Sequence, residues 1–319
     1  AFGGKCNSKE SYKKKKLPDY GEHFYIKIGN KNIIDPNLLH PHKANGLYLY
    51  SFNKNSKNLD LVYKKPVVIY TDLFDRKYDG VASLDSHICC FYDNKINMYR
   101  LYCRANLYRG IRSIQTSISN DLIKWEKFKL LNFTPNFNKR NDNYYCISCS
   151  NYLDSNYYIG ISPYFTKNSK FNNDGLYLLF SEDGYNWIRC NKILEFDRKY
   201  INAPVYGVVN KLKRTNNQLN FYIDFTKVIN NSQYVAEYNI CIDRFSSLFS
   251  ISDKEGFIIL KKISDTILIN FKTHEKGYIK IDNNILKGDQ IDYKVNISNL
   301  SEKFKIVLLK SQIYSITFI

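Results

Sequence analysis

This chain of 319 residues lacks several sequence features, and their absence excludes some classes of protein. It holds one methionine, seven prolines and fourteen glycines. No apolar run reaches the ~20 residues that a membrane-spanning helix needs, so no transmembrane segment is predicted. No stretch repeats apolar residues at the 3.6-residue spacing of an amphipathic helix, which disfavours a helical fold.

Nucleic-acid-binding motifs are also missing. No RNP-like, zinc-finger or helix-turn-helix pattern occurs, so we predict no specific nucleic-acid partner. The net charge of +17 nevertheless favours polyanions such as acidic glycans or anionic lipid head groups. The alternative is a lysine-rich but solvated surface, in keeping with a composition rich in lysine and asparagine.

The eight cysteines include only one C-x-x-C pair, Cys146 and Cys149. Without a second pair or nearby histidines this pair does not make a zinc site. Its strand-like surroundings would turn the two thiols to opposite faces, which weakens a redox motif. Most of the cysteines lie in apolar segments typical of buried small hydrophobes. Their even number permits disulfides without showing them, and no metal site or cofactor is predicted.

Aromatic residues are abundant, with 28 tyrosines and 20 phenylalanines, and they favour sheet. Short aromatic and β-branched runs alternate with polar turn residues, which predicts many short strands. The clearest runs are 47–52, 66–70, 99–103, 157–161, 175–180, 219–224 and 266–271. Both a β-sandwich and a β-propeller fit this spacing.

A repeat decides between these two architectures. Both tryptophans end the same phrase, Ser119-Asn-Asp-Leu-Ile-Lys-Trp125 and Ser181-Glu-Asp-Gly-Tyr-Asn-Trp187. In each phrase an apolar strand ends in S-x-D, a turn follows, and Trp is expected to start the next strand. A period of roughly 60 residues in an all-β chain indicates stacked four-stranded sheets, and residues 85–125 read as one such blade.

Three regions follow from this pattern. Residues 1–22 are polar, basic and without periodicity, and we expect a loosely ordered arm whose lysines could contact anionic surfaces. Residues 23–250 are expected to form the β-propeller. Residues 251–319 are expected to form a small β-sandwich, with strands at 255–260, 265–273, 276–282, 288–295, 304–309 and 313–318.

The repeated phrase itself is expected to be structural. Its Asp can accept hydrogen bonds from nearby backbone N–H groups and close a tight turn. Its Trp offers a broad apolar plate between sheets.

Function in a propeller concentrates at the central funnel, which the first strand of each blade lines. Asp85 opens the clearest blade and Asp174 is taken to open the next. Two such carboxylates could face each other as glycosidic bond cleavage requires, with one protonating the leaving oxygen and the other activating water or attacking. The alternative for each is a turn or capping role.

Three further residues of the same blade are candidate substrate ligands. His87 is either a funnel ligand or a hydrogen-bonded core histidine. Arg104 and Arg112 could bind anionic or hydroxyl-rich ligands with two parallel hydrogen bonds. Solvated surface is the alternative for these arginines.

Several segments together resemble glycosyl-hydrolase-like five-bladed propellers related to glycoside hydrolase families 32 and 43. They are Leu84–His87, Tyr99–Arg104, Gly110–Trp125, Ser181–Arg189, Asp243–Leu248, Leu268–Phe271, Gly277–Ile281, Gly288–Asp289 and Tyr314–Phe318, in the family's order. The resemblance implies a five-bladed propeller followed by a β-sandwich, and carbohydrate as substrate or ligand. Glycosidic bond cleavage by two carboxyl groups does not require a metal, although some funnels of this kind hold a calcium ion.

Two functions remain open. The first is a glycoside-hydrolase-like protein that uses Asp85 and Asp174. The second is a non-catalytic carbohydrate-binding or surface protein with a degenerate site. The family's N-D-P-N-G, R-D-P and E-C phrases are missing, and Glu182 stands where related proteins have Arg, so the sequence does not assign a complete acid/base pair. The divergent N-terminal blade and the lysine-rich arm favour the second function, whereas Asp85-Ser-His87 favours the first. The sequons at Asn132, Asn230, Asn296 and Asn299 point to a secreted or surface location, but an Asn-rich chain contains such sequons by chance.

Overall fold

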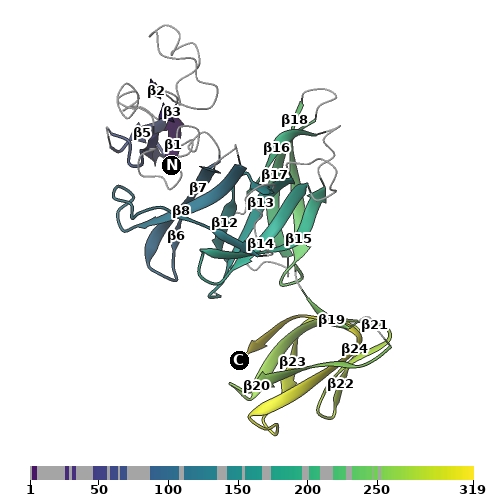
Figure 1. The fold of residues 1–319 in the computed structure, drawn as a ribbon. Helices are drawn as coiled ribbons and strands as arrows, with labels where there is room; N and C mark the ends of the chain where they lie inside the picture. Colours follow the sequence, from purple (N-terminus) through teal and green to yellow (C-terminus); the bar gives the residue numbers. More distant parts are fainter. Residues whose placement is uncertain are drawn as a thin grey trace. The chain divides into compact units, whose positions relative to one another are not determined.

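The computed structural model describes residues 2–5, 26–28, 31–33, 46–55, 58–63, 65–69, 87–107, 111–134, 142–152, 155–166, 174–195, 201–208, 218–227, 232–245, 247–250 and 253–319. These residues form strands, turns and irregular segments, and none of them is helical (Figure 1). The predicted all-β class is therefore confirmed. The predicted number of blades stays a prediction.

The chain divides into two compact units. Unit 1 comprises Ala1–Leu212 and Asn220–Tyr238, and unit 2 comprises Lys213–Leu219 and Asn239–Ile319. The boundaries expected from the sequence, at residues 22 and 250, stay predictions.

A four-stranded antiparallel sheet of unit 1 corresponds to the predicted blade at residues 85–125. Its order is β6 (Cys89–Asp93), β7 (Met98–Leu107), β8 (Ile111–Ser119) and β9 (Lys129–Leu130). Consecutive strands are neighbours, as in a blade. The expectation that Trp125 starts the fourth strand is wrong. The Ser117 hydroxyl donates a hydrogen bond to the Glu126 carbonyl oxygen at 2.6 Å, and strand pairing with β8 begins only at Lys129.

The next sheet repeats this order. It contains β12 (Ser148–Asn151), β13 (Tyr158–Thr166), β14 (Gly175–Ser181) and β15 (Asn186–Glu195). The short strand β11 (Asp142–Tyr144) also pairs with β13, and β10 (Asn132–Thr134) runs parallel to β15. Here Trp187 does begin a strand, as predicted. The first-strand position in this sheet belongs to residues 142–151, so Asp174 does not open it.

The other strands that precede residue 242 form smaller sheets. One has the order β1 (Phe2–Lys5), β4 (Gly46–Asn53) and β5 (Asn58–Leu61), and another contains β2 (Ile26–Ile28) and β3 (Lys31–Ile33). A third has the order β16 (Ile201–Val208), β17 (Gln218–Lys227) and β18 (Ser232–Cys241).

Two N-terminal segments were given expectations from the sequence. Within the expected arm at residues 1–22, residues 2–5 form β1, which pairs with β4. The rest of the arm lies outside the described residues, and the arm stays a prediction. The run at 66–70 makes only a bridge between Val68 and Leu47 in its described part, as Pro66 has no N–H for a ladder.

Unit 2 is built on two strands of 16 residues, β21 (Thr266–Ile281) and β24 (Lys303–Phe318). One half of this pair is flanked by β20 (Gly256–Lys261) and β22 (Asn284–Leu286). The other half is flanked by β19 (Leu248–Ser250) and β23 (Asp289–Asn296). Both halves contribute to one apolar cluster that includes Ile269, Ile281 and Ile306. The expected C-terminal β-sandwich stays a prediction.

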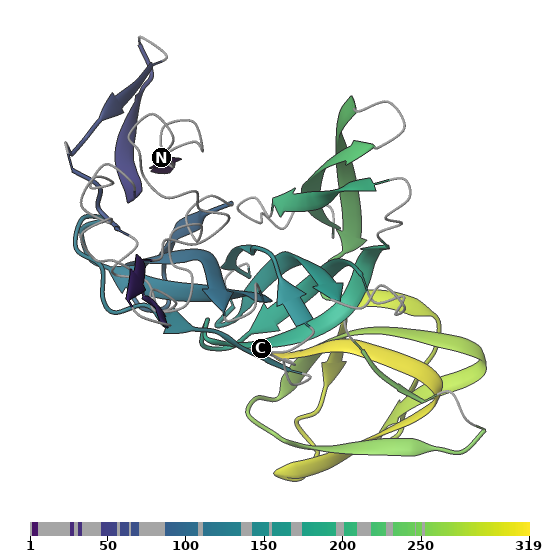
Figure 2. The ribbon, with the colours of Figure 1, turned by 45° about the horizontal axis from the view of Figure 1, so that its top comes forward.

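Each long strand is a single strand where the sequence analysis expected two shorter ones. Breaks were expected at residues 274–275 and 310–312, but the chain continues through both in strand conformation. Lys276 and Lys310 take positive φ values of 59° and 42°, and the pairing register shifts between Thr273 and Tyr278. A bulge therefore bends each strand instead of ending it, and both ribbons are visibly curved (Figure 2).

Candidate functional site

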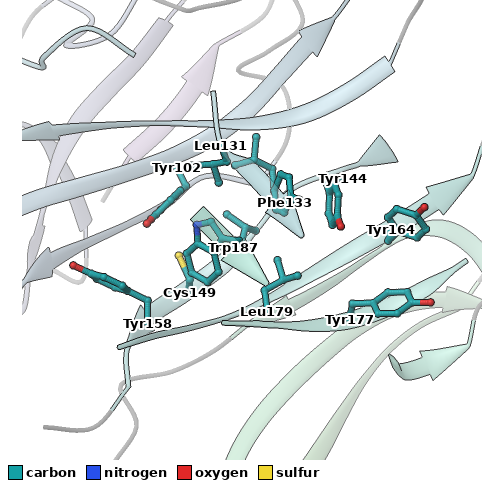
Figure 3. Packing of buried hydrophobic residues seen from close by; sticks show 12 residues of the cluster. Tyr102, Leu131, Phe133, Tyr144, Cys149, Tyr158, Tyr164, Tyr177, Leu179 and Trp187 are labelled. Carbon is teal, nitrogen blue, oxygen red and sulfur yellow. The ribbon is translucent and has the colours of Figure 1, made fainter. Parts of the chain in front are cut away.

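Strand β7 positions the candidate site because its two faces pack against different parts of unit 1. Leu101 and Cys103 join an apolar cluster with Leu47 and Val68 of the N-terminal region. Tyr102 joins the cluster of the next sheet, around Trp187 (Figure 3). Side chains alternate along a strand, so Arg100 and Arg104 lie on the Tyr102 face. We call the contact zone between this face and the sheet β12–β15 the seam.

One end of the seam is closed by a buried ion pair. Asp93 and Arg100 are 0% and 1% exposed, and Arg100 Nε lies 2.8 Å from Asp93 Oδ2. The Tyr158 hydroxyl donates to the same carboxylate oxygen at 2.8 Å. Oδ1 accepts from Asn151 Nδ2 and from the backbone N–H of Lys95, both at 3.1 Å. A carboxylate satisfied this fully is structural, because its lone pairs are engaged within the fold.

The other end of the seam gathers two of the predicted ligands. The guanidinium groups of Arg104 and Arg112 lie 5.0 and 5.6 Å from the ring centroid of Tyr145. Arg104 is 3% exposed, whereas Arg112 and Tyr145 are half-buried. The Arg112 backbone N–H donates to Asn143 Oδ1 at 2.8 Å, which ties β8 to β11. We call Arg104, Arg112 and Tyr145 the Arg–Tyr cluster.

The electrostatics of the Arg–Tyr cluster favour an electron-rich partner. Burial lowers the pKa of Arg104; the nearby Tyr145 opposes that shift, and the positive charge of Arg112 adds to it. A tyrosine face attracts cations through its quadrupole, which accounts for two guanidinium groups at one ring. The half-buried members leave part of this arrangement open to solvent.

A second aromatic group continues from the Arg–Tyr cluster along β11 and β13. The Tyr164 hydroxyl donates to Asp142 Oδ1 at 2.7 Å. Burial, followed by this hydrogen bond, raises the pKa of Tyr164 to about 12, so the phenol stays protonated. The guanidinium of Arg189 lies 4.4 Å from the Tyr164 centroid and 5.1 Å from that of Tyr177.

His87 lies just before β6 and is half-buried. Cys89 is paired with Tyr102, so continuing this register by two residues brings His87 level with Arg104. Burial lowers the pKa of His87, which favours the neutral imidazole at neutral pH. The structure therefore brings His87, Arg104 and Arg112 to one end of the sheet.

The two predicted catalytic carboxylates have different outcomes. Asp85 lies outside the described residues. Asp174 is 6% exposed at the start of β14, the third strand of its sheet, and its Oδ1 accepts from the Thr166 N–H at 2.7 Å and from the Thr166 hydroxyl at 3.0 Å. These bonds close the β13–β14 hairpin. Its catalytic role stays a prediction.

Tyr145 is the member of the cluster that sequence reasoning missed. No sequence feature distinguishes Tyr145 from the other 27 tyrosines, because its contact with two guanidinium groups depends on the packing of strands that are distant in the sequence. The arginines themselves left a signal. Arg104 and Arg112 flank one hairpin, where opposite residues share a face.

No group of three or more His, Cys, Asp or Glu side chains within the described segments is placed to hold a metal ion. The same segments include no helix long and apolar enough to cross a membrane.

Comparison with known proteins gives structural likeness only. No protein-family model matches the chain, and a search of curated proteins finds no match. Several solved structures do match. Glycoside hydrolases are among them. One described as a glycoside hydrolase has 10% identity and a TM-score of 0.42, over 61% of this chain and 56% of that one.

Two further matches have carbohydrate-related descriptions. An N-acetylgalactosamine deacetylase from F. plautii, in complex with blood group B trisaccharide, has 10% identity and a TM-score of 0.37 over 84% of this chain and 64% of that one. An exo-β-1,3-galactanase from Phanerochaete chrysosporium has 6% identity and a TM-score of 0.29 over 92% and 95%. This chain spans less than two thirds of the length of the deacetylase and of the glycoside hydrolase above.

Proposed function

We propose that unit 1 binds carbohydrate at the end of the seam formed by His87 and the Arg–Tyr cluster. The supporting observation is the half-buried ring of Tyr145 with two guanidinium groups beside it. Ligand sites commonly combine an aromatic surface with a few fixed polar groups, which set orientation and specificity. A sugar offers the matching surfaces, since its C–H face packs on a ring and its hydroxyl oxygens accept from Arg and His.

The chemistry proposed for this site is glycoside-hydrolase-like. Such a reaction needs two carboxyl groups about 5–10 Å apart. Asp85 is the first candidate, because it precedes His87 by two residues in the sequence. Asp174 is the second candidate.

A non-catalytic carbohydrate-binding protein is the alternative, and the contacts of Asp174 favour it. Both hydrogen bonds to its Oδ1 come from Thr166 and hold a hairpin. A carboxylate oxygen used in this way serves the fold and is less available to a substrate.

Binding is tested on a glycan array with the full chain and three variants. Arg112→Ala and Tyr145→Ala should each lose most of the glycan signal. Lys127→Ala is the matched control, because it removes one positive charge at an exposed position of the same unit and should keep the signal. An equal loss of glycan signal in all three variants would show that binding does not depend on this site, and would contradict the proposal.

Catalysis is tested separately with a panel of chromogenic glycosides. Hydrolysis that is abolished by Asp85→Asn, in a variant that still binds glycans, supports the enzyme. Glycan binding without hydrolysis by the unmodified chain supports the binding protein. Hydrolysis unchanged in Asp85→Asn would remove Asp85 from the mechanism.

A further inference from the structure

Two cysteines that lie 60 positions apart in the sequence meet between the first strands of successive sheets. Cys89 belongs to β6 and Cys149 to β12. Their Sγ atoms are 3.9 Å apart, and both thiols are free. We propose that Cys89 and Cys149 form a thiol–disulfide exchange site, which a small-molecule disulfide oxidises to a covalent link between the two sheets.

The backbone around the pair holds it in place. The Cys89 thiol donates to the Cys149 carbonyl oxygen at 3.2 Å, and the Cys149 N–H donates to Cys89 Sγ at 3.3 Å. A disulfide has an S–S length of about 2 Å, so bond formation requires the sulfur atoms to approach by roughly another 2 Å. Each sulfur atom is joined to its backbone through one rotatable Cα–Cβ bond, so side-chain rotation can supply part of this approach.

Close packing restricts the Cys149 side of the pair. A Cβ atom on Gly160 would lie 3.1 Å from Cys149 Cβ and 3.1 Å from Trp187 Cζ3. The Cys149 side chain therefore sits beside the indole in the interior of the cluster (Figure 3). Cys149 is 3% exposed, whereas Cys89 is partly exposed, so an oxidant reaches Cys89 first.

The pKa values of the two thiols differ in the same direction: the more accessible thiol, Cys89, is the more acidic one. The hydrogen bond from the Cys149 thiol lowers the pKa of Cys89 despite its burial, and the Cys149 N–H adds to that shift. Burial raises the pKa of Cys149. The thiolate is the attacking species in exchange, which makes Cys89 the attacking residue and Cys149 the resolving residue.

The exchange balances with oxidised glutathione as the oxidant. The Cys89 thiolate attacks one sulfur of oxidised glutathione, forms a mixed disulfide and expels one glutathione thiolate. Cys149 then loses its proton and attacks Cys89 Sγ, which releases the second glutathione. Two protein thiols are oxidised to one disulfide, and one oxidised glutathione is reduced to two glutathione molecules.

Neighbouring cysteines supply matched controls. Cys90 follows Cys89 directly but faces the other way, toward the cluster of Leu101 and Phe128. Cys146 shares the C-x-x-C spacing with Cys149, yet the partner sulfur recorded for Cys149 is that of Cys89. The proposal therefore distinguishes Cys89 from its sequence neighbour and from the expected motif partner.

The test incubates the full chain with oxidised glutathione, blocks the remaining thiols by alkylation and maps disulfide-linked peptides by mass spectrometry. We expect a link between Cys89 and Cys149, and a higher melting temperature that a reductant reverses. Cys90→Ser and Cys146→Ser should keep the link. A link between Cys146 and Cys149, or no link at Cys89, would overturn the proposal.

The order of the two steps is tested with single variants. In Cys149→Ala, which lacks the resolving thiol, Cys89 should accumulate as a glutathione mixed disulfide. In Cys89→Ala, Cys149 should remain a free thiol. Glutathione addition to Cys149 instead, or the absence of any adduct on Cys89 in a folded Cys149→Ala variant, would contradict the assigned roles.

Discussion

Leu122 and Gly184 occupy the same position in two turns of unit 1 and share a left-handed backbone, with φ values of 65° and 76°. In both turns the third N–H after the Ser donates to its hydroxyl, at 3.0 and 2.9 Å. The Trp that follows donates its Nε1–H to the carbonyl of this position, at 3.2 Å in both. The turn is therefore built by the same bonds whether the position is Leu or Gly.

The two positions differ in what surrounds them. A Cβ atom on Gly184 would lie 2.9 Å from Arg100 Cζ and 2.9 Å from the Tyr102 hydroxyl, at the closed end of the seam. We expect Gly184→Ala to lower the free energy of unfolding by about 2–4 kcal/mol, from left-handed strain and overpacking together. Leu122→Ala removes only a half-buried side chain and should cost about 1 kcal/mol.

Urea unfolding followed by tryptophan fluorescence measures both variants, because both tryptophans of the chain belong to unit 1. Equal losses in the two variants would show that the approach of Arg100 to Gly184 does not limit this position.

The sequence predicted these turns well because every interaction in them is local. The expectation that Asp closes the turn is confirmed, since Asp121 Oδ1 accepts two backbone N–H groups at 2.9 and 2.7 Å, and Asp183 Oδ1 accepts two at 2.7 Å. The expected apolar plate is confirmed for Trp187, which is 1% exposed, whereas Trp125 is half-buried.

Features that depend on distant pairing were not predictable in the same way. The approach of Tyr145 to Arg104 and that of Cys89 to Cys149 both join segments from different sheets. Strand alternation fixes the face on which a residue lies, but it does not fix which residue of another sheet it meets. The misplacement of Asp174 has the same cause, because the first strand of its sheet, at residues 142–151, carries no S-x-D or Trp marker.

The buried Asp93–Arg100 pair should be sensitive to loss of either charge. Asp93→Asn leaves the Arg100 guanidinium buried without its counter-charge, and we expect a loss of about 3 kcal/mol in the free energy of unfolding of unit 1. The more exposed pair between Lys192 and Glu195 of the same unit is the control, and Glu195→Gln should change stability by less than about 0.5 kcal/mol. A loss below 1 kcal/mol in Asp93→Asn, from the same urea titrations, would contradict this assignment.

His87 should make unit 1 less stable in mild acid. Its folded-state pKa is lowered by burial, so between that value and the unfolded value of about 6.5 the unfolded chain binds more protons than the folded one. Stability is therefore fully present above about pH 6.5 and falls as the pH drops through this window. Carboxylates titrate mostly below about pH 5, which sets the lower limit of the measurement.

His87→Gln removes this titration. Urea midpoints measured between about pH 7.5 and pH 5 should fall less steeply for the variant than for the unmodified chain. Parallel profiles would show that the His87 proton is not linked to folding.

Arg244 should hold together two strands of unit 2. Its Nε donates to Asn270 Oδ1 at 3.0 Å and its Nη2 to the Gln290 carbonyl at 3.2 Å, with Asp289 Oδ1 at 2.5 Å. The guanidinium thereby bonds to β21 and β23 at once. Arg244→Lys keeps the charge but loses the fork, and we expect a local loss of about 1–2 kcal/mol. Hydrogen exchange should then quicken by roughly ten-fold in the β21 and β23 amides.

A second variant separates geometry from charge at this site. Lys272 also pairs with Asp289, at 3.6 Å, but it is more exposed, and Lys272→Ala should leave exchange in β23 nearly unchanged. If Arg244→Lys behaved like Lys272→Ala, the charge of Arg244 alone would be enough. Faster exchange in Arg244→Lys only would show that the bonds from one guanidinium to Asn270, Asp289 and Gln290 keep β23 on the edge of β21, because a lysine ammonium cannot reach all three acceptors from one position.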